Sequence, residues 1–273
     1  MKDKITALIL SCDKYSDLWE GNVKLFNRNW PGREFSSFIV TDRPAEAELP
    51  DVGIMAAGEG LEWSDRLAVA LGQVKTDYVF VTLDDYYLIK PVDVQKMAEL
   101  LSLMEREGYD YLRLYPRPKR STMDELQGRP GVYHVDTGGN YSVNLYPGIW
   151  RKAFLEKMIR EPQTAWAFEV SLSGRATEYG AKCLCSYNDD YSILDVVRKG
   201  KILHGAHRYF KKHPGIYSGN RPVQSWVYES ALWVKTMLGR HSTGALHSFM
   251  KRVYMFFGGE SYTGMQNKDK KDE

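Results

Sequence analysis

The sequence has few cysteines and no long apolar run. Its 273 residues contain three cysteines, Cys12, Cys183 and Cys185, without the paired spacing of a zinc site or of a disulfide framework. A reducing compartment is therefore expected. The apolar run after Lys4 ends at Ser11 and is too short for a secretion signal, and no later stretch reaches the roughly 18 apolar residues of a membrane span. We expect a cytoplasmic protein.

The sequence also lacks an excess of charge of either sign. The 37 lysines and arginines and 35 aspartates and glutamates leave a net charge of +2, so a nucleic acid is not an expected partner. Basic and aromatic residues do gather near the end of the chain, over residues 242–257. Such a helix can lie on an anionic membrane surface as a peripheral contact, although packing on the domain with solvated charges is the commoner explanation.

Alternating apolar runs and amphipathic segments predict an α/β fold. Three apolar runs end in polar residues, as strands buried on both faces of a parallel sheet do. They span residues 5–10, 35–40 and 78–83. Ser64 is the expected cap of one helix, and Asp93 and Gly108 bound another. We expect a mixed, mostly parallel sheet flanked by helices.

The second half of the sequence predicts shorter elements. Strand candidates at 111–115 and 132–135 flank a loop rich in proline and arginine over 116–130, which suggests a mixed edge of the sheet. Helices are expected at 151–160 and 164–179. We therefore predict a main domain over 1–215, with halves meeting at about 115, then a helical extension over 216–265 and a disordered tail over 266–273.

Carboxylates follow three of the predicted strands. Asp13 follows the first, Asp42 the second, and Asp84 and Asp85 the strand over 78–83. Because ligands of open α/β sheets bind outside the carboxyl ends of the strands, these four side chains are expected at one edge. A hard divalent cation, Mn²⁺ or Mg²⁺, would relieve the repulsion within the adjacent pair. Turn formation by each aspartate is the alternative.

The segment Val79–Asp85 resembles the apolar strand and terminal acidic pair of GT-A nucleotide-sugar glycosyltransferases. The segments Trp63–Leu71 and Ala7–Tyr15 are similar to parts of bacterial transferases that build capsular or other surface polysaccharides. The resemblance covers about residues 5 to 205, most strongly in the first hundred. It implies a GT-A, Rossmann-like fold, a nucleotide-diphosphate sugar donor such as a UDP-sugar, and a divalent metal. It also implies a lipid-linked or polysaccharide acceptor at the inner face of the membrane.

The resemblance also implies roles for the residues at this edge. Asp85 would hold the metal, and Asp84 would contact the donor sugar or ribose. Leu83 stands where a strict Asp-any-Asp motif has its first acid, so the metal requirement stays open. The first strand and the one after it would supply the nucleotide pocket, with Ser11, Asp13 and Asp42. His207, or alternatively His204, would complete the metal shell, although a hydrogen-bonded surface role is the alternative for either histidine.

Further candidates lie on predicted helices and in the second half of the chain. Arg66, in the first turn of its helix, is disfavoured by the helix dipole unless an anion such as a diphosphate lies nearby. The alternative is an Arg66 that folds outward to solvent or pairs with Asp65 or Glu62. Glu169, between aromatic residues, looks like the acceptor-side acid of these transferases and would be the base of an inverting reaction. The alternative is a glutamate favoured by the helix dipole, with Trp166 and Phe168 in the core. Trp150 and Trp166 are candidate acceptor contacts, with packing as the alternative for Trp150.

Two other functions are alternatives for the same sequence features. A sugar-nucleotide nucleotidyltransferase would share the sheet and the carboxylates but should carry a glycine-rich phosphate loop, and Ser11–Tyr15 contains no glycine. A non-catalytic carbohydrate-binding protein would account for the 18 tyrosines and 7 tryptophans, but it needs no acidic pair behind a buried strand.

Overall fold

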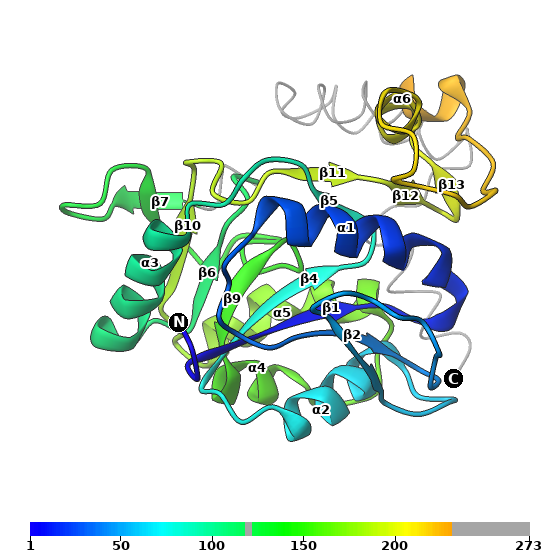
Figure 1. Ribbon diagram of the computed structural model, residues 1–273. Helices are drawn as coiled ribbons and strands as arrows, with labels where there is room; N and C mark the ends of the chain where they lie inside the picture. The colour runs from blue at the N-terminus through cyan, green and yellow to red at the C-terminus, as the bar shows by residue number, and fades with distance from the viewer. Residues whose placement is uncertain (118–121, 231–273) are drawn as a thin grey trace, which may run out of the picture. The chain divides into compact units, whose positions relative to one another are not determined.

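The computed structural model describes residues 1–117 and 122–230 of the chain, in two compact units (Figure 1). The described residues of the first unit are 1–117, 122–196 and 208–220, and those of the second are 197–207 and 221–230. The predicted domain boundary at residue 215 stays a prediction, and most of the predicted extension and tail, with the basic segment 242–257, lies outside the described residues.

A nine-stranded mixed sheet forms the centre of the first unit, in the order β3-β2-β1-β4-β9-β6-β10-β8-β7. The strands are β1 (Ile5–Leu10), β2 (Ser37–Thr41), β3 (Gly53–Ala56), β4 (Tyr78–Leu83), β6 (Tyr111–Arg113), β7 (Thr122–Glu125), β8 (Val132–Val135), β9 (Gly148–Arg151) and β10 (Cys183–Ser186). Only β8 and β9 run against the others. The order β3-β2-β1-β4 is that of a Rossmann-like sheet, so the predicted mostly parallel α/β fold is confirmed.

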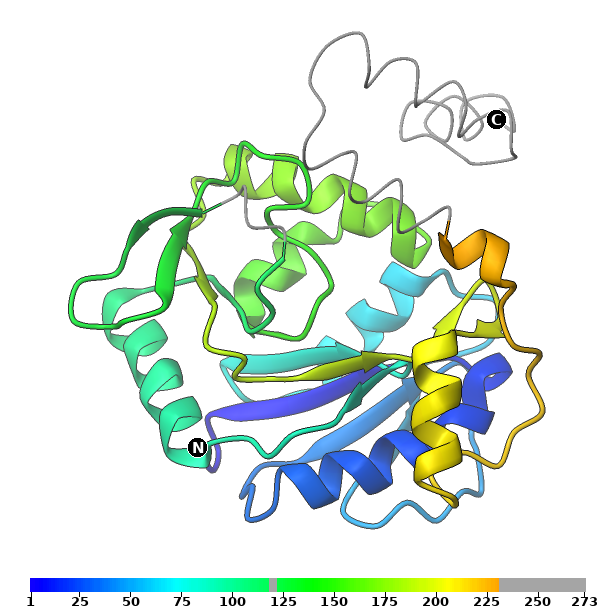
Figure 2. The same cartoon turned by 90° about the horizontal axis from the view of Figure 1, so that it is seen from above.

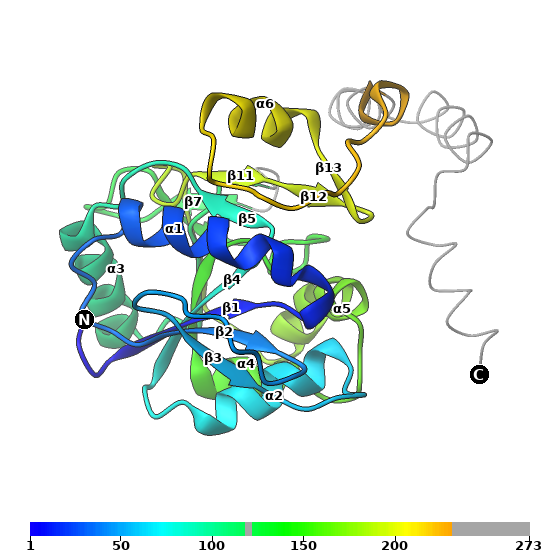
Figure 3. The same ribbon diagram turned by 45° about the vertical axis from the view of Figure 1, so that its right-hand side comes forward.

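Helices cover both faces of this sheet. They are η1 (Asp13–Leu18), α1 (Trp19–Asn29), α2 (Trp63–Gln73), α3 (Val94–Glu107), α4 (Lys152–Met158) and α5 (Ala165–Glu178). One apolar cluster joins the sheet to α1 and α3, and the other joins it to α2, α4 and α5. Figures 1 and 3 show α1 and α2 on opposite faces, and Figure 2 shows α1 and α3 across the strands from α5.

The expected helix caps are confirmed for α3 and corrected for α2. The Asp93 carboxylate accepts a hydrogen bond from the backbone N–H of Lys96 at 3.0 Å, and Gly108 ends α3 with a left-handed φ of 70°. Ser64 is not the cap of α2, because the helix begins at Trp63. The Ser64 hydroxyl is buried and donates to the carbonyl of Glu161 at 3.1 Å, so it holds the loop before α5.

Several short elements had no predicted counterpart. β5 (Tyr86–Leu88) pairs with β11 (Ile193–Asp195) in a separate two-stranded antiparallel sheet, which places Asp195 opposite Tyr86. The edge strand β7 lies within the predicted loop. In the second unit, β12 (Val197–Arg198) and β13 (Lys201–Ile202) form a hairpin, and α6 (His204–Lys212) begins there and continues into the first unit. Within the described ranges, no helix combines the length and apolarity needed to cross a membrane.

Candidate functional site

The topology gathers chemistry-bearing residues from distant segments at one edge of the nine-stranded sheet. β1, β2, β4 and β6 run in the same direction, so the residues that follow them meet at this edge. They include Asp13, Asp42, Asp85 and Tyr115. The reversed strand β9 begins at the same edge, just after Tyr146. We call this the carboxyl edge, and the expected convergence of the aspartates is what the strand directions produce.

Asp84 faces inward at the carboxyl edge. Its residue is only 7% exposed, and its carboxylate accepts a hydrogen bond from the Ser11 hydroxyl, which in turn accepts one from the indole N–H of Trp19 at 2.7 Å. The Asn22 side chain donates to the Asp84 carbonyl at 3.0 Å. These contacts fix the end of β4 against β1 and α1. Asp84 and Ser11, both donor-binding candidates, are therefore also structural partners of one another.

Asp13 and Asp42 lie together at the ends of β1 and β2. The backbone N–H of Asp13 donates to the Asp42 carboxylate at 2.6 Å, and the Thr41 hydroxyl lies 2.9 Å from the Asp13 carboxylate. Burial raises the pKa of Asp42, but the hydrogen bonds from Asp13 and Thr41 and the charge of Arg66 outweigh burial and hold that pKa below its ordinary value. Asp42 is thus an ionised acceptor.

Arg66 lies near these carboxylates in the first turn of α2. Its guanidinium donates to the Leu61 carbonyl at 2.7 Å, and its charge acts on both Asp42 and Cys12. Burial raises the pKa of the Cys12 thiol, the negative charges of Asp84 and Asp42 raise it further, and Arg66 lowers it. The structure therefore brings Arg66 into the same electrostatic environment as Asp42 and Asp84.

Asp85 directly follows Asp84 at the carboxyl edge, between the residues after β1 and β2 and the residues around β6 and β9. It is half-buried, and its carbonyl accepts a hydrogen bond from the Val196 N–H at 2.9 Å, which joins β4 to the end of β11. Burial raises the pKa of the neighbouring Tyr86 well above its ordinary value, and the charges of Tyr146, Asp85, Asp195 and Glu169 raise it further. One phenol therefore lies within electrostatic reach of three carboxylates.

Glu169 is held near the start of α5 by the loop before β9. Its carboxylate accepts a hydrogen bond from the backbone N–H of Leu145 at 3.0 Å. Burial raises the pKa of this carboxyl, and the hydrogen bond from Leu145 only partly offsets that increase. Glu169 and Asp85 therefore both lie within electrostatic reach of Tyr86.

The structure treats the two candidate acceptor tryptophans differently. Trp150 is 0% exposed and packs between Tyr111 and Phe154 in the core, so its predicted contact with the acceptor is wrong. The side of β9 that carries Trp150 faces α4 and α5. The sequence alone did not indicate which side of this strand the helices would cover. Trp166 is half-buried at the start of α5, and its acceptor role stays a prediction.

The metal prediction stays a prediction as well. In residues 1–117 and 122–230, no three histidine, cysteine, aspartate or glutamate side chains converge as a ligand set. His204 and His207 lie in the second unit, where the His204 ring stacks on Trp226 with centroids 4.1 Å apart.

Some residues of the carboxyl edge had no signal in the sequence. Asp195 and Tyr86 meet through the pairing of β11 with β5, and Tyr115 and Tyr146 meet through the pairing of β6 with β9. Each of these strands is only three or four residues long. The abundance of tyrosine was a hint of aromatic ligand contacts, but nothing in the sequence indicated which tyrosines would converge.

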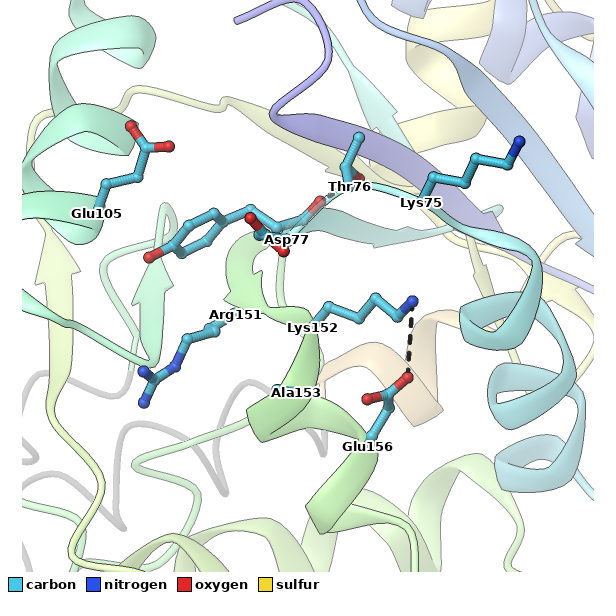
Figure 4. Close-up of a pocket in the computed structure, with 9 residues that line it drawn as sticks. Lys75, Thr76, Asp77, Glu105, Arg151, Lys152, Ala153 and Glu156 are labelled. Carbon is cyan, nitrogen blue, oxygen red and sulfur yellow. Dashed lines mark hydrogen bonds and ion pairs between the residues drawn. The ribbon is translucent and has the colours of Figure 1, made fainter.

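A cavity of about 460 Å³ lies at the opposite edge of the sheet, where β4 begins (Figure 4). It is lined by Lys75, Thr76, Asp77, Tyr78, Glu105, Arg151, Lys152, Ala153 and Glu156. Its basic and acidic side chains compensate one another, and Figure 4 shows Lys152 directed toward Glu156, 3.8 Å away. It shares no residue with the carboxyl edge, so we do not assign the chemistry to it.

Comparisons with known proteins find distant structural likenesses. No protein-family model and no curated protein sequence matches the chain. Two crystal structures of TarS from S. aureus resemble it at 14% and 13% identity with TM-scores of 0.42 and 0.45. Each match covers 69% of this chain, and the chain spans 36% of the longer TarS chain and 59% of TarS 1-349. Because both TM-scores are below 0.5, we draw no conclusion about function from them.

Replacing Glu169 with glutamine should stabilise the protein in a pH-dependent way. The folded-state pKa of Glu169 is raised, so its ionised form costs stability above that pKa, and the cost disappears as the pH falls and the carboxyl is protonated. Glu169→Gln keeps the oxygen that accepts from Leu145 and removes the charge. We expect a higher free energy of unfolding than wild type in urea at pH 8, and no gain at pH 4.

The matched control is Glu20→Gln, at an exposed glutamate of α1, which should change stability little at either pH. An equal gain for Glu169→Gln at both pH values, or no gain at pH 8, would contradict the assignment of a buried, destabilising charge at Glu169.

Proposed function

We propose that the chain is a nucleotide-sugar glycosyltransferase that works at the carboxyl edge. The observation that supports this proposal best is the common environment of Asp85 and Glu169 around Tyr86, with Asp42 and Arg66 beside Asp84 on the other half of the edge. The ionised Asp42 carboxylate, which accepts hydrogen bonds, and the positive charge of Arg66 suit a nucleoside diphosphate on one half of the edge. A carboxyl of raised pKa on the other half suits an acceptor hydroxyl.

In this proposal the donor lies along β1, β2 and the start of α2. The ionised Asp42, with Asp13, accepts hydrogen bonds from the ribose hydroxyls or the base. Arg66 and the N-terminus of the eleven-residue helix α2 carry positive charge that favours the diphosphate. The Asp84 carboxylate, which accepts a hydrogen bond from Ser11, fixes the end of β4 next to the donor sugar.

Glu169 would act as the general base of an inverting transfer. The acceptor hydroxyl gives its proton to the Glu169 carboxylate while its oxygen bonds to the anomeric carbon of the donor sugar. The bond from that carbon to the diphosphate oxygen breaks, and the nucleoside diphosphate leaves with the bonding electrons. A raised pKa makes the ionised Glu169 a stronger base than an ordinary carboxylate.

Asp85 is the side chain in this proposal that would contact Mn²⁺ or Mg²⁺. Such a cation would neutralise charge on the departing diphosphate. Because the described residues contain no complete ligand set, the donor phosphates would have to supply further oxygens. The sequence resemblance supports a UDP-sugar as donor and a lipid-linked or polysaccharide acceptor of surface polysaccharide synthesis, at the inner face of the membrane.

Nucleotide binding is the direct test of the proposed function. We expect UDP, or another nucleoside diphosphate in a panel with ADP, GDP and CDP, to raise the melting temperature, and Mn²⁺ to increase that shift. Asp85→Ala should abolish the Mn²⁺-dependent part and leave a smaller metal-independent shift, because Asp42 and Arg66 remain. If no nucleoside diphosphate stabilises the wild-type protein with or without Mn²⁺, the glycosyltransferase proposal is wrong.

The catalytic role of Glu169 is tested separately from donor binding. Glu169→Gln should reduce sugar transfer by about 100-fold or more, the usual range for loss of a general base, with an unchanged nucleotide-induced shift. Glu178→Gln, at an exposed position of the same helix, should transfer at nearly the wild-type rate. If Asp195→Asn abolishes transfer while Glu169→Gln does not, the base is Asp195 and the assignment to Glu169 fails.

A further inference from the structure

Three tyrosines from separate segments stack at the carboxyl edge. Tyr86 begins β5, Tyr146 lies just before β9 and Tyr115 lies just after β6. The Tyr146 ring is 5.5 Å from the Tyr86 ring at an interplanar angle of 18°, and 4.5 Å from the Tyr115 ring at 34°. All three residues are half-buried, so each keeps some contact with solvent. We call them the tyrosine stack.

The tyrosine stack is not part of the apolar core. Four other tyrosines, Tyr78, Tyr109, Tyr111 and Tyr191, belong to the two core clusters of the described residues, but no member of the stack does. Burying a tyrosine contributes to stability chiefly when its ring is removed from water and its hydroxyl is hydrogen-bonded. Half-buried rings that stack on one another at a ligand-binding edge therefore need an explanation other than core packing.

The position of the stack connects it to the proposed chemistry. Tyr146 directly follows Leu145, whose N–H binds Glu169, and Tyr86 directly follows Asp85. In the strand order, β9 and β6 lie on one side of β4, and β1 and β2 lie on the other. Tyr115 and Tyr146 therefore belong to the half of the edge that carries Glu169, away from the half that carries Asp13 and Asp42.

We propose that the tyrosine stack binds a pyranose ring of the acceptor, which makes the acceptor a glycan. This inference rests on the proposed function. An aromatic face contacts the apolar C–H face of a sugar ring, while phenol hydroxyls reach the sugar's own hydroxyls. A nucleobase could also stack on tyrosine, but the polar groups suited to a nucleoside lie on the β1–β2 half. The stack then orients the acceptor hydroxyl toward Glu169.

Saturation-transfer NMR with simple sugars tests this proposal and does not require the natural acceptor. The probes are the methyl glycosides of glucose, galactose, N-acetylglucosamine and N-acetylgalactosamine, each at millimolar concentration. We expect wild type to transfer saturation to the ring protons of at least one probe. Tyr115→Phe should retain the signal, and Tyr115→Leu should reduce it several-fold. Tyr115 is the best target because it lies at the end of the stack that is remote from Asp85 in the sequence.

Two controls separate the possible causes of a changed signal. Tyr179→Leu removes an exposed tyrosine that directly follows α5 and should leave the signal as in wild type. Nucleoside-diphosphate stabilisation of Tyr115→Leu should equal that of wild type, which shows that the variant is folded and that its donor half is intact. The stack proposal is overturned if no probe is detected, or if Tyr115→Leu matches wild type, while the nucleotide still binds. If no nucleotide binds to the wild-type protein, the proposed function itself is wrong.

Discussion

The contact between the ends of β1 and β4 is the constraint on which the rest of the site depends. The strands are parallel and in register from Ile5 opposite Tyr78 to Leu10 opposite Leu83, so both end at the same edge. There the Ser11 hydroxyl donates to the buried Asp84 carboxylate, with Trp19 behind it. The Asp84 side chain is buried, and the chain turns away from β4 at Asp85. Tyr86 then begins β5, which pairs with β11.

The reversal of direction at β9 divides the carboxyl edge into two chemically different halves. On the β1–β2 half, hydrogen bonds hold Asp42 ionised beside Arg66. On the β9–β6 half, burial favours the protonated form of Glu169, and aromatic rings replace charged groups. A polar half for an anionic donor and an aromatic half for a neutral acceptor would meet at Asp85. This division is the physical basis of the proposed transfer reaction.

The sequence was informative where an element is long or strongly patterned, and uninformative where it depends on a distant partner. The predicted bounds of β1 and β4 match the structure because continuous apolar runs between polar residues leave no alternative register, and α3 has both caps in its own sequence. β5, β9 and β11 form only through pairing with segments far along the chain, so the convergence of Tyr86 and Asp195 was not predictable. Trp150 shows the same limit, since residue type alone does not tell which face of a strand is covered.

The central claim is that one edge of the sheet binds the donor and carries out the chemistry. A crystal structure of the chain with Mn²⁺ and the nucleoside diphosphate that stabilises it most tests this claim most directly. The account predicts the nucleoside beside Asp13 and Asp42, with the diphosphate between Arg66 and Asp85. A nucleotide bound in the cavity at the opposite edge, among Lys75, Arg151 and Lys152, would contradict it.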